Sequence, residues 1–157
     1  MGRINNGRAY FFSPAGLILI ESSGPKITAL RFVRRISSSA EKTAIIKKAL
    51  RELSEYFYKH RKKFTLPLKF SGTDFQIKVW KELCKIPRGG LISYKELAAK
   101  IGRPRAARAV ANACGLNKIA VIVPCHRVVA SDGGLGGFSP GISIKKKLLG
   151  VENNRRV

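Results

Sequence analysis

The sequence predicts an α/β protein in two parts, a small antiparallel sheet covered by one helix and a second part that is mostly helical. Three short apolar or alternating runs, separated by turn residues, predict strands in the first third of the chain: Arg8–Phe12, Gly16–Glu21 and Lys26–Val33. Apolar stripes that follow capping residues predict the helices. The 157 residues suffice for one domain or for two small ones that share an interface.

One helix is expected to cover the predicted sheet. Ser38 and Glu41 stand at the spacing of a capping box, and the helix that they would begin ends near His60. Its apolar side chains recur on one face and are Ile45, Ile46, Ala49, Leu50, Leu53 and Phe57. The next segment, Lys62–Gly72, has little periodicity and is the expected linker.

The second domain is expected to begin after this linker, so we predict domains at residues 1–70 and 71–157. Thr73 and Gln76 form a second capping pair, and the apolar stripe that follows them ends at Ile86-Pro87. This pattern predicts a helix in the core of the second domain.

Two short helices around a glycine-containing turn predict a helix-turn-helix. Ser93 and Glu96 cap the first helix, Gly102-Arg103-Pro104 ends it, and the second helix spans Arg105 to about Cys114. An ordinary helical hairpin has the same pattern, and the charge of the chain is what favours DNA.

The second of these helices carries two long cations, Arg105 and Arg108, on an alanine-rich surface. The alanines are Ala106, Ala107, Ala109, Ala111 and Ala113. Such a helix has few groups able to read base edges in the major groove, but it can approach a minor groove closely and insert one arginine into the base stack. Alternatively, the alanines only favour helix and pack on a neighbour.

The composition has a large excess of positive charge, 31 Lys and Arg against 9 Asp and Glu, for a net charge of +22. Double-stranded DNA is the expected partner, because each cation that neutralises a phosphate releases a counterion. A surface adapted to a hot or salty cell is the alternative. An anionic membrane is disfavoured, because no amphipathic anchor, lipidation motif or long apolar run is present.

The cysteines, Cys84, Cys114 and Cys125, occur in no paired spacing, so a disulfide framework is not expected. No signal peptide is recognised, and we expect a reducing, intracellular location. With only His60 and His126 and no Cys/His cluster, no metal site is expected.

Cys125 is the candidate nucleophile. It follows Pro124 at the end of the apolar run Ile119–Val123, which predicts a buried strand, and it precedes His126. A thiol reacts as the thiolate, and His126 is a base that can help to form it. A buried inert thiol is the commoner role of a cysteine, and we assign that role to Cys84 and Cys114. The glycine-rich segment Ser131–Gly141 lets backbone approach a flat ligand, although by itself it would predict a flexible loop.

These residues resemble the O6-methylguanine-DNA methyltransferases, densely from Phe75 to Glu152 and only in outline before that. The residues that carry the resemblance are Trp80, Ile86-Pro87, Ser93-Tyr94, Arg108-Ala109-Val110, Asn117, Pro124-Cys125-His126-Arg127-Val128, the glycine-rich loop, and Lys147-Leu148-Leu149 with Glu152. The resemblance implies a ribonuclease H-like first domain and a helix-turn-helix of winged-helix type in the second. A related group without activity replaces the cysteine, often by tryptophan, and the presence of Cys125 argues against it.

The resemblance also implies a reaction, direct reversal of DNA damage. An O6-alkylguanine, or an O4-alkylthymine, is flipped out of the duplex, and its alkyl group passes irreversibly to Cys125, once per molecule. No cofactor is implied. The protein would act as a monomer in the cytoplasm, on the nucleoid, or in the nucleus of a eukaryote.

Roles of single residues follow from the same resemblance. The implied catalytic residues are Cys125 as acceptor, His126 as its base through water, Glu152 as the group that orients the imidazole, Asn117 as the brace of the turn and Tyr94 as donor to the flipped base. The implied substrate contacts are Ser139, Phe138, Val128 and Arg108, the last filling the hole in the duplex. The implied DNA contacts are Arg105, Arg108, Ala106, Ala107, Tyr94 and Lys118.

The chain departs from the family pattern at two positions. Lys118 stands where a proline usually follows the asparagine, which predicts a looser turn and an added cation near DNA. Phe138 stands where a tyrosine is frequent, which keeps the aromatic face. Two other functions remain open from the residues alone, a DNA-binding damage sensor with a structural cysteine and a thiol hydrolase that uses Cys125, His126 and Glu152.

Overall fold

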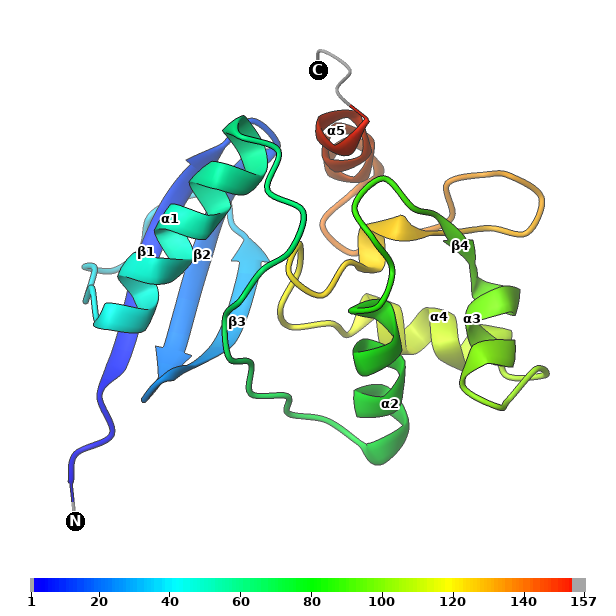
Figure 1. Cartoon of the computed structure of the whole chain (residues 1–157), viewed down its shortest axis with the longest axis horizontal. Helices are drawn as coiled ribbons and strands as arrows, with labels where there is room; N and C mark the ends of the chain where they lie inside the picture. Colours follow the sequence, from blue (N-terminus) through cyan, green and yellow to red (C-terminus); the bar gives the residue numbers. More distant parts are fainter. Residues whose placement is uncertain (1, 154–157) are drawn as a thin grey trace. The chain divides into compact units, whose positions relative to one another are not determined.

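The computed structural model describes residues 2–153, and the chain divides into two compact units, Met1–Phe70 and Ser71–Val157 (Figure 1). Each unit has its own buried apolar core. Among the described residues, no helix is both long enough and apolar enough to cross a membrane.

The first unit is a three-stranded antiparallel sheet with one helix on it, as the sequence predicts. The strands β1 (Asn6–Ser13), β2 (Gly16–Ser23) and β3 (Lys26–Phe32) lie in the order β1-β2-β3. Helix α1 (Ala44–Tyr58) packs on this sheet (Figure 1) through an apolar face that includes Ile46. The periodicity of the sequence therefore predicted which face of α1 is buried.

The predicted start of α1 is wrong. The helix begins after Thr43, and the pair Ser38 and Glu41 forms no capping box. Ser38 instead bonds the side chains of Arg8 and Tyr10, and the backbone of Glu41 pairs with that of Arg8 at 2.8 and 2.9 Å. These long-range bonds hold the segment beside β1, so residues 38–43 stay outside the helix.

Part of the predicted linker belongs to the first unit. Ile27 of β3 donates from its amide to the Pro67 carbonyl at 2.8 Å and accepts from the Lys69 amide at 2.9 Å. This isolated parallel bridge adds a short extended piece to the sheet. A single bridge does not require alternating apolar residues, so the sequence pattern could not predict this pairing.

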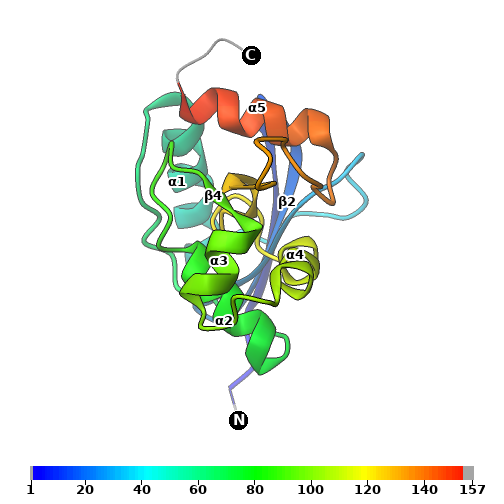
Figure 2. The same cartoon turned by 90° about the vertical axis from the view of Figure 1, so that its right-hand side faces the viewer.

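The second unit contains four helices among the described residues: α2 (Asp74–Leu83), α3 (Tyr94–Lys100), α4 (Ala107–Gly115) and α5 (Ile142–Glu152). The capping boxes predicted for α2 and α3 are both present. Helices α2 and α3 pack on α4 (Figure 2), and the Trp80 indole of α2 donates to the Ala113 carbonyl of α4 at 2.8 Å. The predicted helix-turn-helix is therefore formed by α3 and α4.

The predicted strand Ile119–Val123 is wrong. This segment is buried but folds into turns, with Val121 at φ 70° and the Val123 amide bonded to the Ile119 carbonyl. β-Branched composition here reflects burial, and it does not by itself require an extended backbone. The next residues, Cys125–Arg127, form a 3-10 turn (η1).

A two-stranded parallel ladder that the sequence did not predict joins the reactive segment to α3. Strand β4 (Ile92–Ser93) pairs with β5 (Val128–Val129), so that Ser93 faces Val129. Tyr94 follows β4 and Cys125–Arg127 precedes β5, and the ladder therefore brings these two parts of the motif into one region.

Candidate active site

Asn117 holds the buried turn that leads to Cys125. Its side-chain amide donates to the Val123 carbonyl at 2.8 Å and to the Cys125 Sγ at 3.2 Å, and its oxygen accepts from the Ile119 amide at 2.9 Å. One side chain thus bonds both ends of the turn and the thiol. A primary amide suits this position, because it offers donors and an acceptor together.

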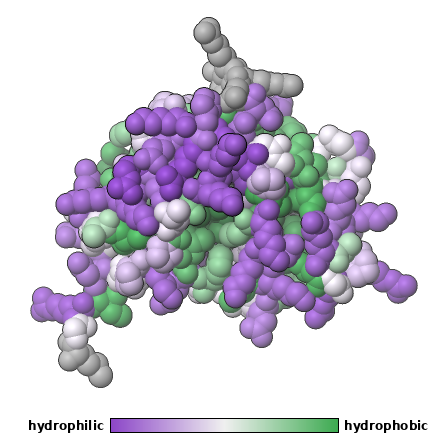
Figure 3. Space-filling view, in the orientation of Figure 1, coloured by the Kyte–Doolittle hydropathy of each residue, from purple (hydrophilic) through white to green (hydrophobic). Residues whose placement is uncertain are grey.

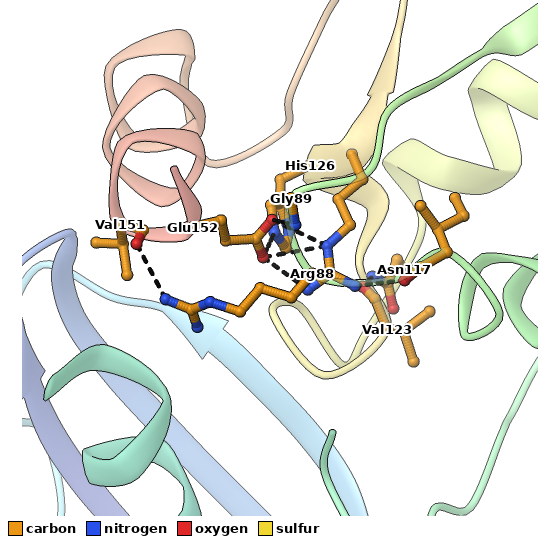
Figure 4. Close-up of polar contacts among 9 residues, drawn as sticks. Arg88, Gly89, Asn117, Val123, His126, Val151 and Glu152 are labelled. Atoms are coloured by element: carbon orange, nitrogen blue, oxygen red, sulfur yellow. Dashed lines mark hydrogen bonds and ion pairs between the residues drawn. The ribbon is translucent and has the colours of Figure 1, made fainter. Parts of the chain in front are cut away.

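Glu152, the last residue of α5, is the centre of a buried charged network (Figure 4). Its carboxylate bonds His126 Nε2 at 2.7 Å, and it accepts from Arg127 Nε and from an Arg127 terminal nitrogen at 2.7 Å. It also accepts from the Gly89 amide at 3.2 Å. Arg127 reaches the Ile86 carbonyl at 2.6 Å as well. The sequence-based roles included Glu152 and His126 but missed Arg127, although it lies within the motif.

The network fixes the protonation states of His126 and Glu152. Burial alone would raise the pKa of Glu152, but the hydrogen bonds that it accepts from His126 and Arg127, together with the positive charge of Arg127, hold this pKa well below its usual range. Burial lowers the pKa of His126, against the raising effect of Glu152. The imidazole is therefore neutral at pH 7. It donates from Nε2 to the carboxylate, and Nδ1 keeps its lone pair.

The Cys125 thiol is 7% exposed, and burial raises its pKa. The Asn117 hydrogen bond and the charge of Lys145 both act in the opposite direction. The resting group is therefore a thiol that needs a base. Burial also raises the pKa of Cys114, to about 12, as expected for an inert thiol. Cys84, predicted to be buried, is exposed at the end of α2.

Lys145 of α5 is a site residue that the sequence analysis missed. Its side chain is fully buried, and its ammonium donates to the carbonyls of Val128 at 2.6 Å, Leu135, and Gly137 at 3.3 Å. These acceptors belong to β5 and to the glycine-rich loop. The helical spacing of Lys145, Leu148 and Glu152 on the buried face of α5 is the sequence signal that could have revealed it.

The glycine-rich loop lies against α3 and α4. The Tyr94 hydroxyl donates to the Gly137 carbonyl at 3.3 Å, and the Ser139 hydroxyl donates to the Gly115 carbonyl at 2.7 Å. Gly136 has φ +70°, and a Cβ there would come within 2.9 Å of the Tyr94 ring. Phe138 is half-buried. The structure therefore brings Tyr94 to the loop that contains Phe138 and Ser139.

Four of the six predicted DNA contacts lie at or before the start of α4, whereas Tyr94 begins α3 and Lys118 follows α4. Arg105 and Arg108 are exposed, and Ala106 and Ala107 are half-buried. Arg105 and Ala106 precede the helix and line a shallow hollow together with Arg103 and Pro104. Lys118 is exposed and donates to the Ser71 carbonyl at 3.1 Å. This bond ties the turn to the segment before α2, although the proline usual in the family is absent.

Asn117→Asp is expected to make Cys125 less acidic. Aspartate keeps the acceptor for Ile119, but it replaces the donor to Sγ by a negative charge that repels the thiolate. The titration of Cys125 with a small thiol-alkylating reagent, followed on the Cys125 peptide, should move to higher pH. Asn112→Asp makes the same charge change at an exposed position of α4 and is the control. Equal titrations in the two variants would exclude the role given to Asn117.

A thiol bonded by an amide, an adjacent buried histidine–carboxylate pair and a helix-turn-helix define a class, the thiol-dependent enzymes that act with a DNA-binding unit. Comparison with known families shows which family within this class the chain resembles. Residues 8–70 match the ribonuclease-like domain of 6-O-methylguanine DNA methyltransferase, and residues 74–154 match its DNA-binding domain.

Relatives match along nearly the whole chain. A methylated-DNA–protein-cysteine methyltransferase of Methanosarcina barkeri is 45% identical in an alignment of 148 residues that covers 90% of this chain and 94% of the relative. A crystal structure of Mycobacterium tuberculosis O6-methylguanine methyltransferase superposes with a TM-score of 0.86 at 38% identity, covering 97% of this chain and 95% of that one. A structure of Mycobacterium tuberculosis OGT in complex with DNA gives a TM-score of 0.85 at 40% identity, with coverages of 93% and 92%.

The chain therefore belongs to the 6-O-methylguanine DNA methyltransferase family. Its enzyme class is that of the methylated-DNA–protein-cysteine methyltransferases, and its C-terminal unit is the DNA-binding domain.

Proposed function

We propose that this protein repairs DNA by direct reversal, taking the alkyl group from O6 of a flipped guanine, or from O4 of a flipped thymine, onto Cys125. The observation that carries the proposal is the Cys125 thiol, bonded by Asn117 and next in sequence to the buried His126–Glu152 pair. Residues 71–157 would act as the domain that performs both DNA binding and alkyl transfer.

His126 would remove the thiol proton through Nδ1. Nε2 already bonds Glu152, and Nδ1 is buried and has no hydrogen-bond partner among residues 2–153. A water molecule between Nδ1 and Sγ would complete the path, as in general-base catalysis. The positive charge that forms on the imidazole would be stabilised by the Glu152 carboxylate.

The transfer itself exchanges one bond for another. Sγ forms a bond to the alkyl carbon while the bond from that carbon to O6 breaks, and the electron pair of the broken bond stays on the guanine. The guanine then takes up the proton that left the thiol, and the Tyr94 hydroxyl would stabilise the base by a hydrogen bond. Burial raises the pKa of Tyr94 to about 12, so this hydroxyl remains a donor. The product is a thioether with no chemical route back to the thiol in this site, which gives one turnover per molecule.

Base flipping assigns a role to each of the predicted contacts with DNA and with the damaged base. A base inside a duplex cannot present its O6 substituent to a buried thiol, and a mispaired alkylated guanine costs less to extrude than a paired one. Exposed Arg108 on the alanine-rich helix would occupy the gap. Ser139 would contact O6, the backbone of Val128 and Cys125 would bind the base edge, and Phe138 would form one wall. Tyr94 would exchange its bond to Gly137 for the base.

Mass spectrometry tests the proposal directly. Incubation with duplex DNA that contains O6-methylguanine should add one methyl group per protein molecule, on the Cys125 peptide. Cys125→Ser should gain no mass and should still bind the duplex. Duplex binding without any mass gain in the unmodified protein would instead indicate a damage sensor, and repeated turnover would exclude irreversible transfer.

A further inference from the structure

The segment after α1 folds back along that helix. Arg61 binds Glu55 at 2.6 Å and Glu52 at 2.7 Å, and Glu52 also accepts from the Thr65 amide at 2.9 Å. Lys48 of α1 donates to the Thr65 carbonyl at 3.1 Å. Glu52 is fully buried, so these contacts fix the course of residues 61–65 beside the helix.

This arrangement gathers cations on one surface of the first unit. We call it the α1 basic surface, and it consists of Lys47, Lys48, Arg51, Lys59, Lys62 and Lys63. All but Lys48 are exposed. Figure 3 shows hydrophilic surface over α1 and the segment that follows it. The two acidic residues of the region, Glu52 and Glu55, both form ion pairs with Arg61 and therefore do not neutralise the lysines.

The surface is poor in ion pairs. Within the described part of the chain, Lys47, Lys59, Lys62 and Lys63 form none, and Arg51 reaches Glu55 at 3.9 Å. A surface adapted to heat typically interleaves both signs of charge in networks. Here one sign predominates, which is the pattern that attracts a polyanion.

The distribution of charge between the two units also favours a polyanionic partner for the first unit. Residues 1–70 contain 15 Lys and Arg against 4 Asp and Glu, a net charge of +11, which is half of the total of +22. The helix-turn-helix and the reactive thiol both lie in the other unit. The cations of the first unit therefore need an explanation separate from the α4 contacts.

We propose that the α1 basic surface is a second phosphate-binding surface for duplex DNA. It would add sequence-independent affinity and hold the protein on undamaged DNA while lesions are sought. The proposal rests on the proposed function only in taking DNA as the partner, because it requires no alkyl transfer.

The salt dependence of binding to a long undamaged duplex tests this surface. The surface variant carries Lys59→Gln, Lys62→Gln and Lys63→Gln, and the control variant carries Lys26→Gln, Lys42→Gln and Lys69→Gln. All six lysines are exposed in the same unit, so both variants lose the same charge. The plot of log K against log salt should become shallower by about 2 to 3 in the surface variant, about 0.9 per lost contact, and should change little in the control.

Equal slopes in the two variants would overturn the proposal and assign the effect to net charge. A second result would also overturn the proposal: the surface variant keeps the parental salt slope on DNA but loses binding to vesicles of anionic lipid. That result would indicate a membrane-binding surface. Both variants should transfer the methyl group from free O6-methylguanine base at the parental rate. If the parental protein gained no methyl group from duplex DNA that contains O6-methylguanine, the proposed function would fail, while the comparison of binding to undamaged duplex kept its meaning.

Discussion

Glu152→Gln is expected to lower the free energy of unfolding by about 3–5 kcal/mol and to abolish most alkyl transfer. Glutamine keeps the shape of the side chain but removes the charge that faces Arg127, which is 6% exposed. A buried guanidinium without its counter-charge accounts for the loss of stability. The lost transfer follows from His126, whose Nε2 would no longer face a carboxylate able to stabilise the imidazolium.

Urea unfolding as a function of pH checks the electrostatic part of this prediction. The pKa of Glu152 is depressed in the folded protein, so its stabilising contribution is complete above about pH 4.5, its usual value, and is lost as the pH falls below that. The difference between parent and variant should therefore shrink in acid. Glu82→Gln, which removes a surface pair with Lys85, is the control and should cost less than about 1 kcal/mol. A difference independent of pH would argue against a buried charge pair.

The parts of the fold that depend on local patterns could be predicted from the sequence. Alternation and turn residues gave the three strands, and the capping boxes at Thr73 and Ser93 gave the starts of α2 and α3. The capping box at Ser38 failed because its hydroxyl is used by β1, a partner 28 or more residues away in the chain. Local spacing cannot weigh such a competing long-range bond.

The candidate site likewise has residues that the sequence motif identified and features that it could not predict. Cys125, His126 and Asn117 lie within one short stretch of sequence, and the motif named them. The turn that joins Asn117 to Cys125 could not be foreseen, because Val121 has a backbone conformation that valine rarely adopts. Helical spacing could have indicated that Lys145 is buried, but not what it binds, because its acceptors are backbone carbonyls, which no side-chain pattern marks.

Lys145→Met is expected to slow alkyl transfer by about 10- to 100-fold while binding to undamaged duplex stays near the parental value. Methionine fills a similar volume but donates nothing to the carbonyls of Val128, Leu135 and Gly137. The glycine-rich loop would lose its buried anchor, and the base pocket that it borders would be less well ordered. DNA affinity should persist, because α4 does not depend on these bonds.

The loss of Lys145 should also leave a signature at the thiol. Its positive charge lowers the pKa of Cys125, so the variant should require a higher pH for the same rate of alkylation. Lys146→Met removes the same charge from the next, exposed position of α5 and should retain the parental rate and pH profile. Hydrogen exchange at the amides of residues 133–139 should be faster in Lys145→Met alone. Identical rates and exchange in the two variants would show that Lys145 neither anchors the loop nor adjusts the thiol.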